Sequence, residues 1–116
     1  MTNPASSASA VADFSETRRN MDDNRELFDE IVKLFLVDAP LRLGRLREAI
    51  EQGNRVAVKH EAHAIKGMVG IFAAPRAMLA AGALESLAQQ ASGELSADEL
   101  GLALGELETA VINYIW

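Results

Sequence analysis

Cysteine is absent from this chain of 116 residues, which excludes a disulfide scaffold and a thiolate metal site. Aromatic residues make up only 5% of the sequence, and this scarcity disfavours strands. No hydrophobic run is long enough to span a bilayer, and the N-terminus lacks the basic-then-apolar order of a secretory signal. These absences favour a soluble helical protein without direct membrane contact.

Alanine and leucine are abundant instead, and the length suits one small domain. The net charge of −6 and the pI near 4.8 argue against nucleic-acid binding. The charge is unevenly spread, however. Between Arg55 and Leu84 the only acid is Glu61, against four basic residues and both histidines of the chain. This locally basic stretch suits an anionic partner or group, although an ordinary solvent-exposed helix face could have the same composition.

Hydrophobic residues recur at helical spacing along most of the chain, and nothing alternates with the period of a strand. The pattern predicts helices over Phe14–Met21, Asp22–Asp38, Pro40–Gln52, Arg55–Ile71 and Pro75–Ala91, and a last helix after a Ser96–Glu99 capping box. Pro40 is expected to break or kink the chain. Gly53-Asn54 should end one helix and cap the next.

The predicted fold is an all-α, antiparallel four-helix bundle with one or two flanking N-terminal helices, present as a monomer. Residues 1–12 are expected to be a disordered lead-in, with residues 13–116 as the bundle domain. The apolar stripe over Asp22–Asp38 is taken to contain Leu27, Ile31 and Leu34, with two phenylalanines beside it. The residues expected in the core are Val58, Ile65, Val69, Phe72, Leu27, Ile31, Leu46, Ile50, Leu84, Leu87, Leu104, Leu107 and Val111.

The stretch from His60 to Phe72 sorts onto two helix faces. One is an apolar stripe, and the other carries, at i, i+3, i+4 and i+7, the residues His63, Lys66, Gly67 and Gly70. A glycine within a helix costs about 1 kcal/mol relative to alanine, so two of them beside a histidine need a reason. Without Cβ atoms there, another protein or a phosphoryl group can approach the imidazole closely.

The segment His63-Ala64-Ile65-Lys66-Gly67 resembles the His-x-[Leu/Ile]-Lys-Gly core of histidine-containing phosphotransfer (HPt) domains of bacterial phosphorelays. The similarity continues on both sides and covers roughly Phe14 to Ala91, while the last helix matches only as a helix. The matching segments are Asp23–Leu27, an Asp-x-Pro break at Asp38–Pro40, the Gly53-Asn54 turn, Ala74–Arg76 and the Leu84-Glu85 pair. Two departures are Ala73-Ala74, where the family usually has Gly-Ala, and Met68, where small residues are common.

The resemblance implies that His63 is phosphorylated on a ring nitrogen and exchanges the phosphoryl group with an aspartate of a response-regulator receiver domain. The chain would then be a covalent carrier and not an enzyme with its own ATP site. Lys66 would place a cation beside the phosphoryl oxygens, and Gly67 would leave room for the group and the receiver. Glu85 lies where related domains carry a glutamate or glutamine bonded to the other ring nitrogen.

Gly70, His60 and Lys59 are further candidates for docking the receiver. No cofactor is expected, because the magnesium ion and the acidic pocket would belong to the receiver. The second expected partner is a histidine kinase or hybrid kinase. The chain would be cytoplasmic, either alone or as the cytoplasmic part of a larger hybrid sensor kinase. The sequence names neither the donor, the receiver nor the direction of phosphoryl flow.

Several alternatives compete with this interpretation. His63 on its own would more often be a structural histidine. His60-Glu61 superficially resembles the phosphoacceptor helix of sensor kinases, but the Arg-x-Pro that follows there is missing. A metal site on His60 and His63 lacks a third ligand, so no metal is expected. A helical adaptor that binds a receiver or a kinase without carrying phosphate is the remaining function, and it would not require Lys66 and Gly67 beside His63.

Overall fold

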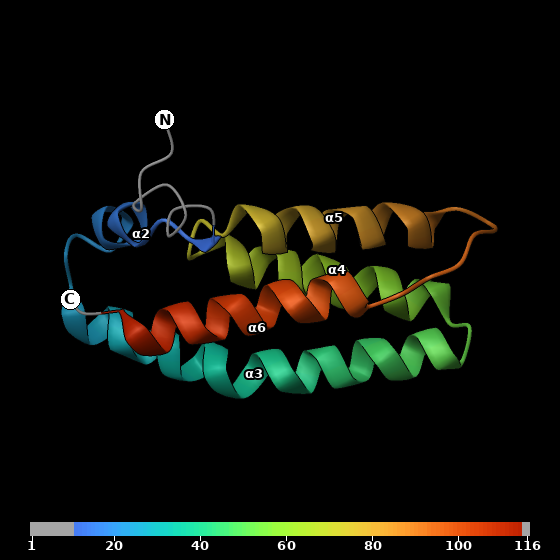
Figure 1. The fold of residues 1–116 in the computed structure, drawn as a ribbon, viewed down its shortest axis with the longest axis horizontal. Helices are drawn as coiled ribbons and strands as arrows, with labels where there is room; N and C mark the ends of the chain where they lie inside the picture. Colours follow the sequence, from blue (N-terminus) through green and yellow to red (C-terminus); the bar gives the residue numbers. More distant parts are fainter. Residues whose placement is uncertain (1–10, 115–116) are drawn as a thin grey trace.

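In the computed structural model, which describes residues 11–114, every regular element is a helix. Four long helices lie alongside one another as an elongated bundle: α3 (Arg25–Glu51), α4 (Arg55–Gly70), α5 (Pro75–Gln89) and α6 (Asp98–Asn113). Consecutive helices run in opposite directions, and the short helix α2 (Phe14–Asn20) lies at one end (Figure 1). The predicted all-α antiparallel bundle with a flanking N-terminal helix is confirmed over this range.

Most of the disordered lead-in expected over residues 1–12 lies outside the described residues, which begin at Val11. Residues 11 and 12 are described, and Ala12 is buried. The backbone N–H of Asp13 then donates to the carbonyls of Phe72 and Ala73 at 3.0 and 3.1 Å. The chain is therefore packed against the bundle from Ala12 onward.

Pro40 was expected to break or kink the chain; the break, and with it the division into helices over Asp22–Asp38 and Pro40–Gln52, is wrong, because α3 continues through Pro40 as one helix. An interior proline costs about 3 kcal/mol, since it lacks an N–H and its ring crowds the preceding turn. Pro40 is exposed, so the carbonyl left without its helical partner is on the solvent side. The core face of α3 on either side of the proline, where Phe35, Ala39 and Leu46 are buried, works against this cost.

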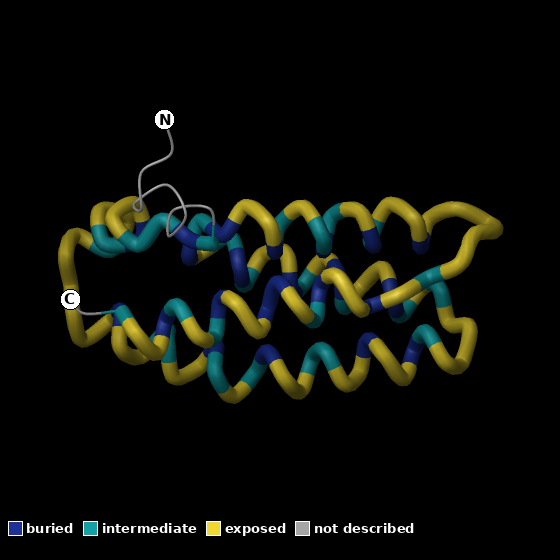
Figure 2. Tube along the Cα trace, in the orientation of Figure 1, coloured by how far each residue is buried: buried dark blue, intermediate teal, exposed yellow. Residues whose placement is uncertain are grey.

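The core face of α3 also differs from the predicted one. The buried residues are Phe28, Phe35, Ala39, Leu46 and Ala49. Leu27 and Leu34 are 43% and 60% exposed, while Ile31 and Ile50 are half-buried. Figure 2 shows the buried positions of the long helices turned toward the bundle interior. The predicted stripe was therefore rotated by about one residue, or 100° of helix.

The other helices bury the faces that the sequence predicts, with one exception. On α4 the buried residues are Val58, Ala62, Ile65 and Val69, and Phe72 follows in the turn. Helix α6 buries Leu100, Ala103, Leu104, Leu107 and Val111. On α5 Leu84 is buried, whereas Leu87 is 38% exposed and therefore not a core residue. The remaining buried positions of α5 are alanines, which let α4 pack closely against it.

Aromatic rings fill the core at the end of the bundle where α2 lies. Phe28 and Phe72 make an edge-to-face contact with ring centroids 6.3 Å apart, and Phe14 of α2 makes edge-to-face contacts with both, at 6.1 and 6.2 Å. Thr17, the one buried polar residue recorded in residues 11–114, donates its hydroxyl to the carbonyl of Ile71 at 2.9 Å. Helix α2 therefore holds the end of α4 through both apolar and polar contacts.

The turn before α4 follows the prediction and the start of α6 does not. Gly53 has φ +67°, and the Asn54 side chain accepts from the N–H of Ala57 at 3.1 Å. Helix α6 has Ala97 as its N-cap residue, and Ser96 accepts instead from the N–H of Asp98 at 3.2 Å. The predicted capping box is wrong, because the helix begins one residue later than that motif requires.

Replacing Ala73 with glycine should raise the free energy of unfolding by about 0.5–1 kcal/mol. Ala73 has φ +47°, and a left-handed backbone costs alanine about 1–2 kcal/mol, of which glycine loses part again through its larger unfolded-state entropy. Chemical denaturation measures the difference. Ala74→Gly is the matched control, because Ala74 is fully buried with φ −98°, and that variant should be destabilised. A variant at residue 73 no more stable than the parent would contradict this account.

Candidate functional site

His63 projects from the middle of α4 with its side chain 72% exposed. Ala62 and Ile65, which lie on the core side of α4, are fully buried and so turn His63 toward solvent. On α5, Glu85 is only 16% exposed and its Oε2 lies 2.8 Å from Nδ1 of His63. A carboxylate can only accept in this contact, so the neutral ring carries its proton on Nδ1 and its lone pair on Nε2.

Lys66 lies one turn further along α4 and reaches the same carboxylate. Its Nζ is 3.9 Å from Oε1 of Glu85. A Cβ atom placed on Gly82 of α5 would meet Cδ, Cε and Nζ of Lys66, each at 3.9 Å. The lysine side chain therefore runs across α5 over a position without a side chain. Glu85 thus binds the imidazole with one oxygen and holds the lysine ammonium near the other.

The two glycines of this face have different surroundings. A Cβ atom on Gly67 would meet nothing within 4 Å, so no contact within the described structure requires a glycine there. Gly70 is half-buried, and a Cβ on it would lie 3.9 Å from Cε of Met78. This is an ordinary van der Waals distance, so packing of α4 on α5 leaves room for a Cβ atom at residue 70. Gly67 alone is an open position beside the histidine.

Lys59 and His60 lie on the other side of His63, one turn earlier. Together with His63 and Glu85 they line a shallow depression of about 280 Å³. Both residues are exposed. The sequence-predicted residues Lys59, His60, His63 and Glu85 are thus brought together in one place, with Lys66 at its edge. Gly70 lies two turns from His63 and borders a separate depression that also contains Asp13 and Glu16.

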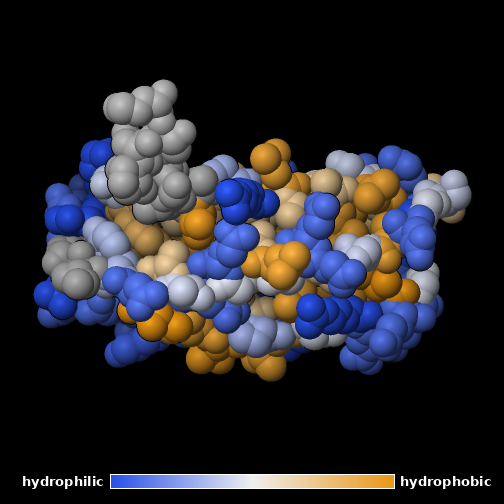
Figure 3. All heavy atoms as spheres, in the orientation of Figure 1, coloured by the Kyte–Doolittle hydropathy of each residue, from blue (hydrophilic) through white to orange (hydrophobic). Residues whose placement is uncertain are grey.

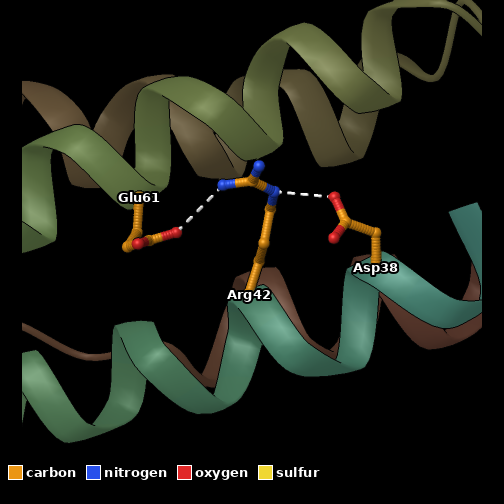
Figure 4. Close-up of polar contacts among 3 residues, drawn as sticks. All are labelled: Asp38, Arg42 and Glu61. Carbon is orange, nitrogen blue, oxygen red and sulfur yellow. Dashed lines mark hydrogen bonds and ion pairs between the residues drawn. The ribbon is translucent and has the colours of Figure 1, made fainter.

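Glu61, the acid closest in sequence to His63, is turned away from it toward α3. Arg42 donates from Nε to Asp38 at 2.8 Å and from Nη1 to Glu61 at 3.3 Å (Figure 4). The hydrogen bond to Asp38, more than the nearby Glu61, raises the pKa of Arg42 above its ordinary value. This bridge joins the two turns around Pro40 to α4. It also removes one negative charge from the surroundings of the imidazole, which leaves that face basic apart from Glu85.

An apolar depression of about 120 Å³ lies between α3 and α4 beside this face. Leu34 of α3 and Ile71, just after α4, are its most exposed members, at 60% and 42%. Met68 also lines it and is half-buried. The side chain of Met68 therefore faces α3. It does not lie on the face of α4 that carries His63 and Gly67.

Two general features of residues 11–114 bear on the site. No group of three or more potential ligands that could hold a metal ion occurs among them. None of their helices combines the length and the apolar character needed to cross a membrane.

A comparison with models of known protein families matches residues 30–113 to the Hpt domain. The match spans most of the chain and includes the whole of α4, α5 and α6. The chain therefore belongs to the Hpt domain family, whose members are histidine phosphotransfer modules of two-component systems. Members of the family generally interact with receiver domains and kinases. No match was found among curated proteins or among solved structures.

Sequence reasoning did not find three residues that shape this region. Gly82 lies beneath the side chain of Lys66, and Arg42 holds Glu61 away from the imidazole. Arg55, the first residue of α4, donates to the carbonyls of Leu87, Gln90, Ser92 and Gly93 at 2.7–3.3 Å. Each of these contacts joins separate elements, so helical periodicity carries no signal for them. A glycine inside α5 was the one detectable clue.

Proposed function

We propose that this domain accepts a phosphoryl group on Nε2 of His63 and exchanges it with the aspartate of a response-regulator receiver. The observation that carries the proposal is the 2.8 Å contact between Glu85 and Nδ1 on an exposed ring, in a chain of the Hpt family. That contact leaves the lone pair of Nε2 directed outward, where a phosphoryl donor can reach it. A helical adaptor would need neither the contact nor the exposure.

The transfer step breaks the bond between phosphorus and the aspartate oxygen and forms one between phosphorus and Nε2. The carboxylate leaves with the bonding electron pair, and no proton has to move. The phosphorylated ring carries a positive charge, and Glu85 stabilises that charge while it keeps the proton on Nδ1. In the reverse direction the P–N bond breaks and Nε2 regains its lone pair. The same geometry therefore supports transfer both ways.

Lys66 supplies the positive charge that phosphoryl transfer needs beside the equatorial oxygens. Its Nζ lies 3.9 Å from Glu85, which is a loose contact. The ammonium can therefore turn toward a phosphoryl group on His63 without breaking a short hydrogen bond. Magnesium and the remaining acidic residues would come from the receiver, so the chain acts as a carrier and not as an independent enzyme.

Receiver docking would use the exposed side of α4 together with the apolar depression between α3 and α4. Leu34 and Ile71 offer apolar contact there, and Gly67 offers a close approach of backbone to backbone. Lys59 and His60 would face the acidic residues around the receiver aspartate. The histidine kinase would use the same face, because it too must reach His63.

Replacing Glu85 with alanine should slow phosphoryl transfer about tenfold, because the ring loses its orientation and its preferred tautomer. Glu85→Gln should retain more activity, since the amide oxygen still accepts from Nδ1–H. Transfer rates from a phosphorylated receiver measure the effect. Ring-nitrogen NMR of His63 provides a second readout, in which the Nδ1–H tautomer should lose population in Glu85→Ala. Unchanged rates and an unchanged tautomer would show that Glu85 is only a boundary carboxylate.

The test of the function itself is incubation of the domain with several phosphorylated receivers. Label that appears on the domain, and that is acid-labile and base-stable, would identify a phosphohistidine carrier. A folded domain that binds a receiver but takes up no label from any of them would instead identify an adaptor.

A further inference from the structure

A second concave surface lies between α5 and α6, away from His63. Two adjacent depressions of about 520 and 460 Å³ share Ala80, Ala83 and Glu99, so they form one continuous groove, here called the α5–α6 groove. Ala83 and Glu85 are two residues apart on α5 and therefore project from nearly opposite sides of that helix. The groove is thus separated from the candidate phosphoacceptor site by the body of α5.

The walls of the α5–α6 groove are apolar and unusually exposed. Leu79 and Leu102 line it at 74% and 71% exposure, and they are the two most exposed large hydrophobic residues in the described part of the chain. Leu79, Ala83 and Leu87 follow one another at intervals of four on α5 and are all exposed. Figure 3, with α6 in front, shows hydrophobic side chains on both helices among hydrophilic ones. A ridge of this kind spans about 12 Å, the length of two helical turns.

The border of the groove is acidic. Its charged residues are Glu94, Asp98, Glu99, Glu106 and Arg76. Arg76, the only base among them, is already paired with Glu106 at 2.9 Å. The other three carboxylates make no ion pair with any residue in the range 11–114. Apolar walls with an uncompensated negative border are complementary to an apolar stripe flanked by lysine and arginine.

We propose that the α5–α6 groove binds an amphipathic helix of a partner protein, with leucine-like residues on one face and basic residues on both sides of it. Alanines at the floor of the groove, Ala80 and Ala103, let such a helix approach closely, as ridges of one helix fit the grooves between others. The negative border disfavours the alternatives. A second copy of this chain would place the same carboxylates against each other, and an anionic lipid or nucleic acid would be repelled.

This surface would hold the domain to a partner without covering His63. Leu102 lies in the groove and not in the candidate site, so the inference does not depend on the phosphotransfer proposal. The variant Leu102→Lys tests it, because a residue 71% exposed tolerates lysine without loss of the fold and its charge should repel a basic helix. Ile112→Lys is the matched control, since Ile112 is on the same helix, is 66% exposed and lies outside the groove.

The probe is a leucine–lysine amphipathic peptide of about 18 residues, long enough for a stable bound helix, titrated into the domain and followed by amide NMR. Shifts should concentrate on α5 and α6. Leu102→Lys should weaken binding about tenfold, as loss of a central apolar contact does, while Ile112→Lys should leave it almost unchanged. A peptide with glutamate in place of lysine should not bind. The proposal fails if shifts fall on α3 and α4, if the glutamate peptide binds equally, if both variants behave alike, or if the domain dimerises through this groove.

Discussion

Replacing His63 with glutamine should abolish uptake of phosphoryl groups and leave the fold intact. Glutamine has no ring nitrogen with a lone pair, so the P–N bond cannot form. The side chain is 72% exposed and its one recorded partner is Glu85, so little packing is lost. Label transferred from a phosphorylated receiver measures the function, and circular dichroism with thermal unfolding measures the fold.

His60→Gln is the matched control for this experiment. His60 is also exposed, lies one turn away on the same helix and lines the same depression, but no carboxylate within residues 11–114 bonds to its ring. Transfer should persist with a modest reduction at most. Label lost only with His60 would move the acceptor by nearly one turn and would remove the reason for a glycine at residue 67. Unfolding of His63→Gln would instead make His63 a structural residue.

Replacing Gly67 with leucine should reduce transfer from a receiver about a hundredfold while stabilising the isolated domain by about 0.8 kcal/mol. A Cβ atom at this position meets nothing within 4 Å and Gly67 is exposed, so a side chain can extend into solvent and the helix gains propensity. The approaching receiver does not have that room. A variant that is more stable but transfers more slowly would show that Gly67 serves the access of the partner. A packing role would instead predict a loss of stability.

Two further measurements complete the Gly67 test. Gly105→Leu is the matched control, because Gly105 is an exposed helix glycine on α6 with the same open surroundings. It should gain similar stability and keep full transfer. Phosphorylation by phosphoramidate, a small donor, should survive in Gly67→Leu. Equal loss with the small donor and the receiver would place the effect at His63 itself, and no loss with either would contradict the access argument.

Helix α4 was predictable in detail because one short segment determined it. Its apolar stripe is unambiguous, Asn54 caps its start, and Gly67 is costly enough to indicate a reason outside the helix. The contact of Glu85 with the ring was expected from the resemblance and not from periodicity. Leu84 and Leu87 lie on either side of Glu85, and only the packing of α5 against α4 decides that Leu84 is inward and Glu85 faces His63.

Helix α3 was harder, because its sequence is apolar on more than one face. Leu27 and Leu34 form one stripe, and Phe28 and Phe35 form another beside it. Contacts with Phe72, more than 35 residues away in the chain, select the phenylalanine face. The helix break predicted at Pro40 was wrong for a related reason. A local rule assigns the ring a cost of about 3 kcal/mol, but it cannot weigh that cost against burial along a helix that crosses the whole bundle.

The attachment of α2 has a consequence for where this domain can be cut. The family match begins at Glu30, inside α3. Thr17, Phe14 and Phe28 all precede it. The two phenylalanines cover Phe72, and Thr17 bonds the carbonyl of Ile71 at the end of α4. A fragment trimmed to the matched range would leave an aromatic surface bare to water. The unit that must be inherited or transplanted intact is therefore longer than the region by which its family is recognised.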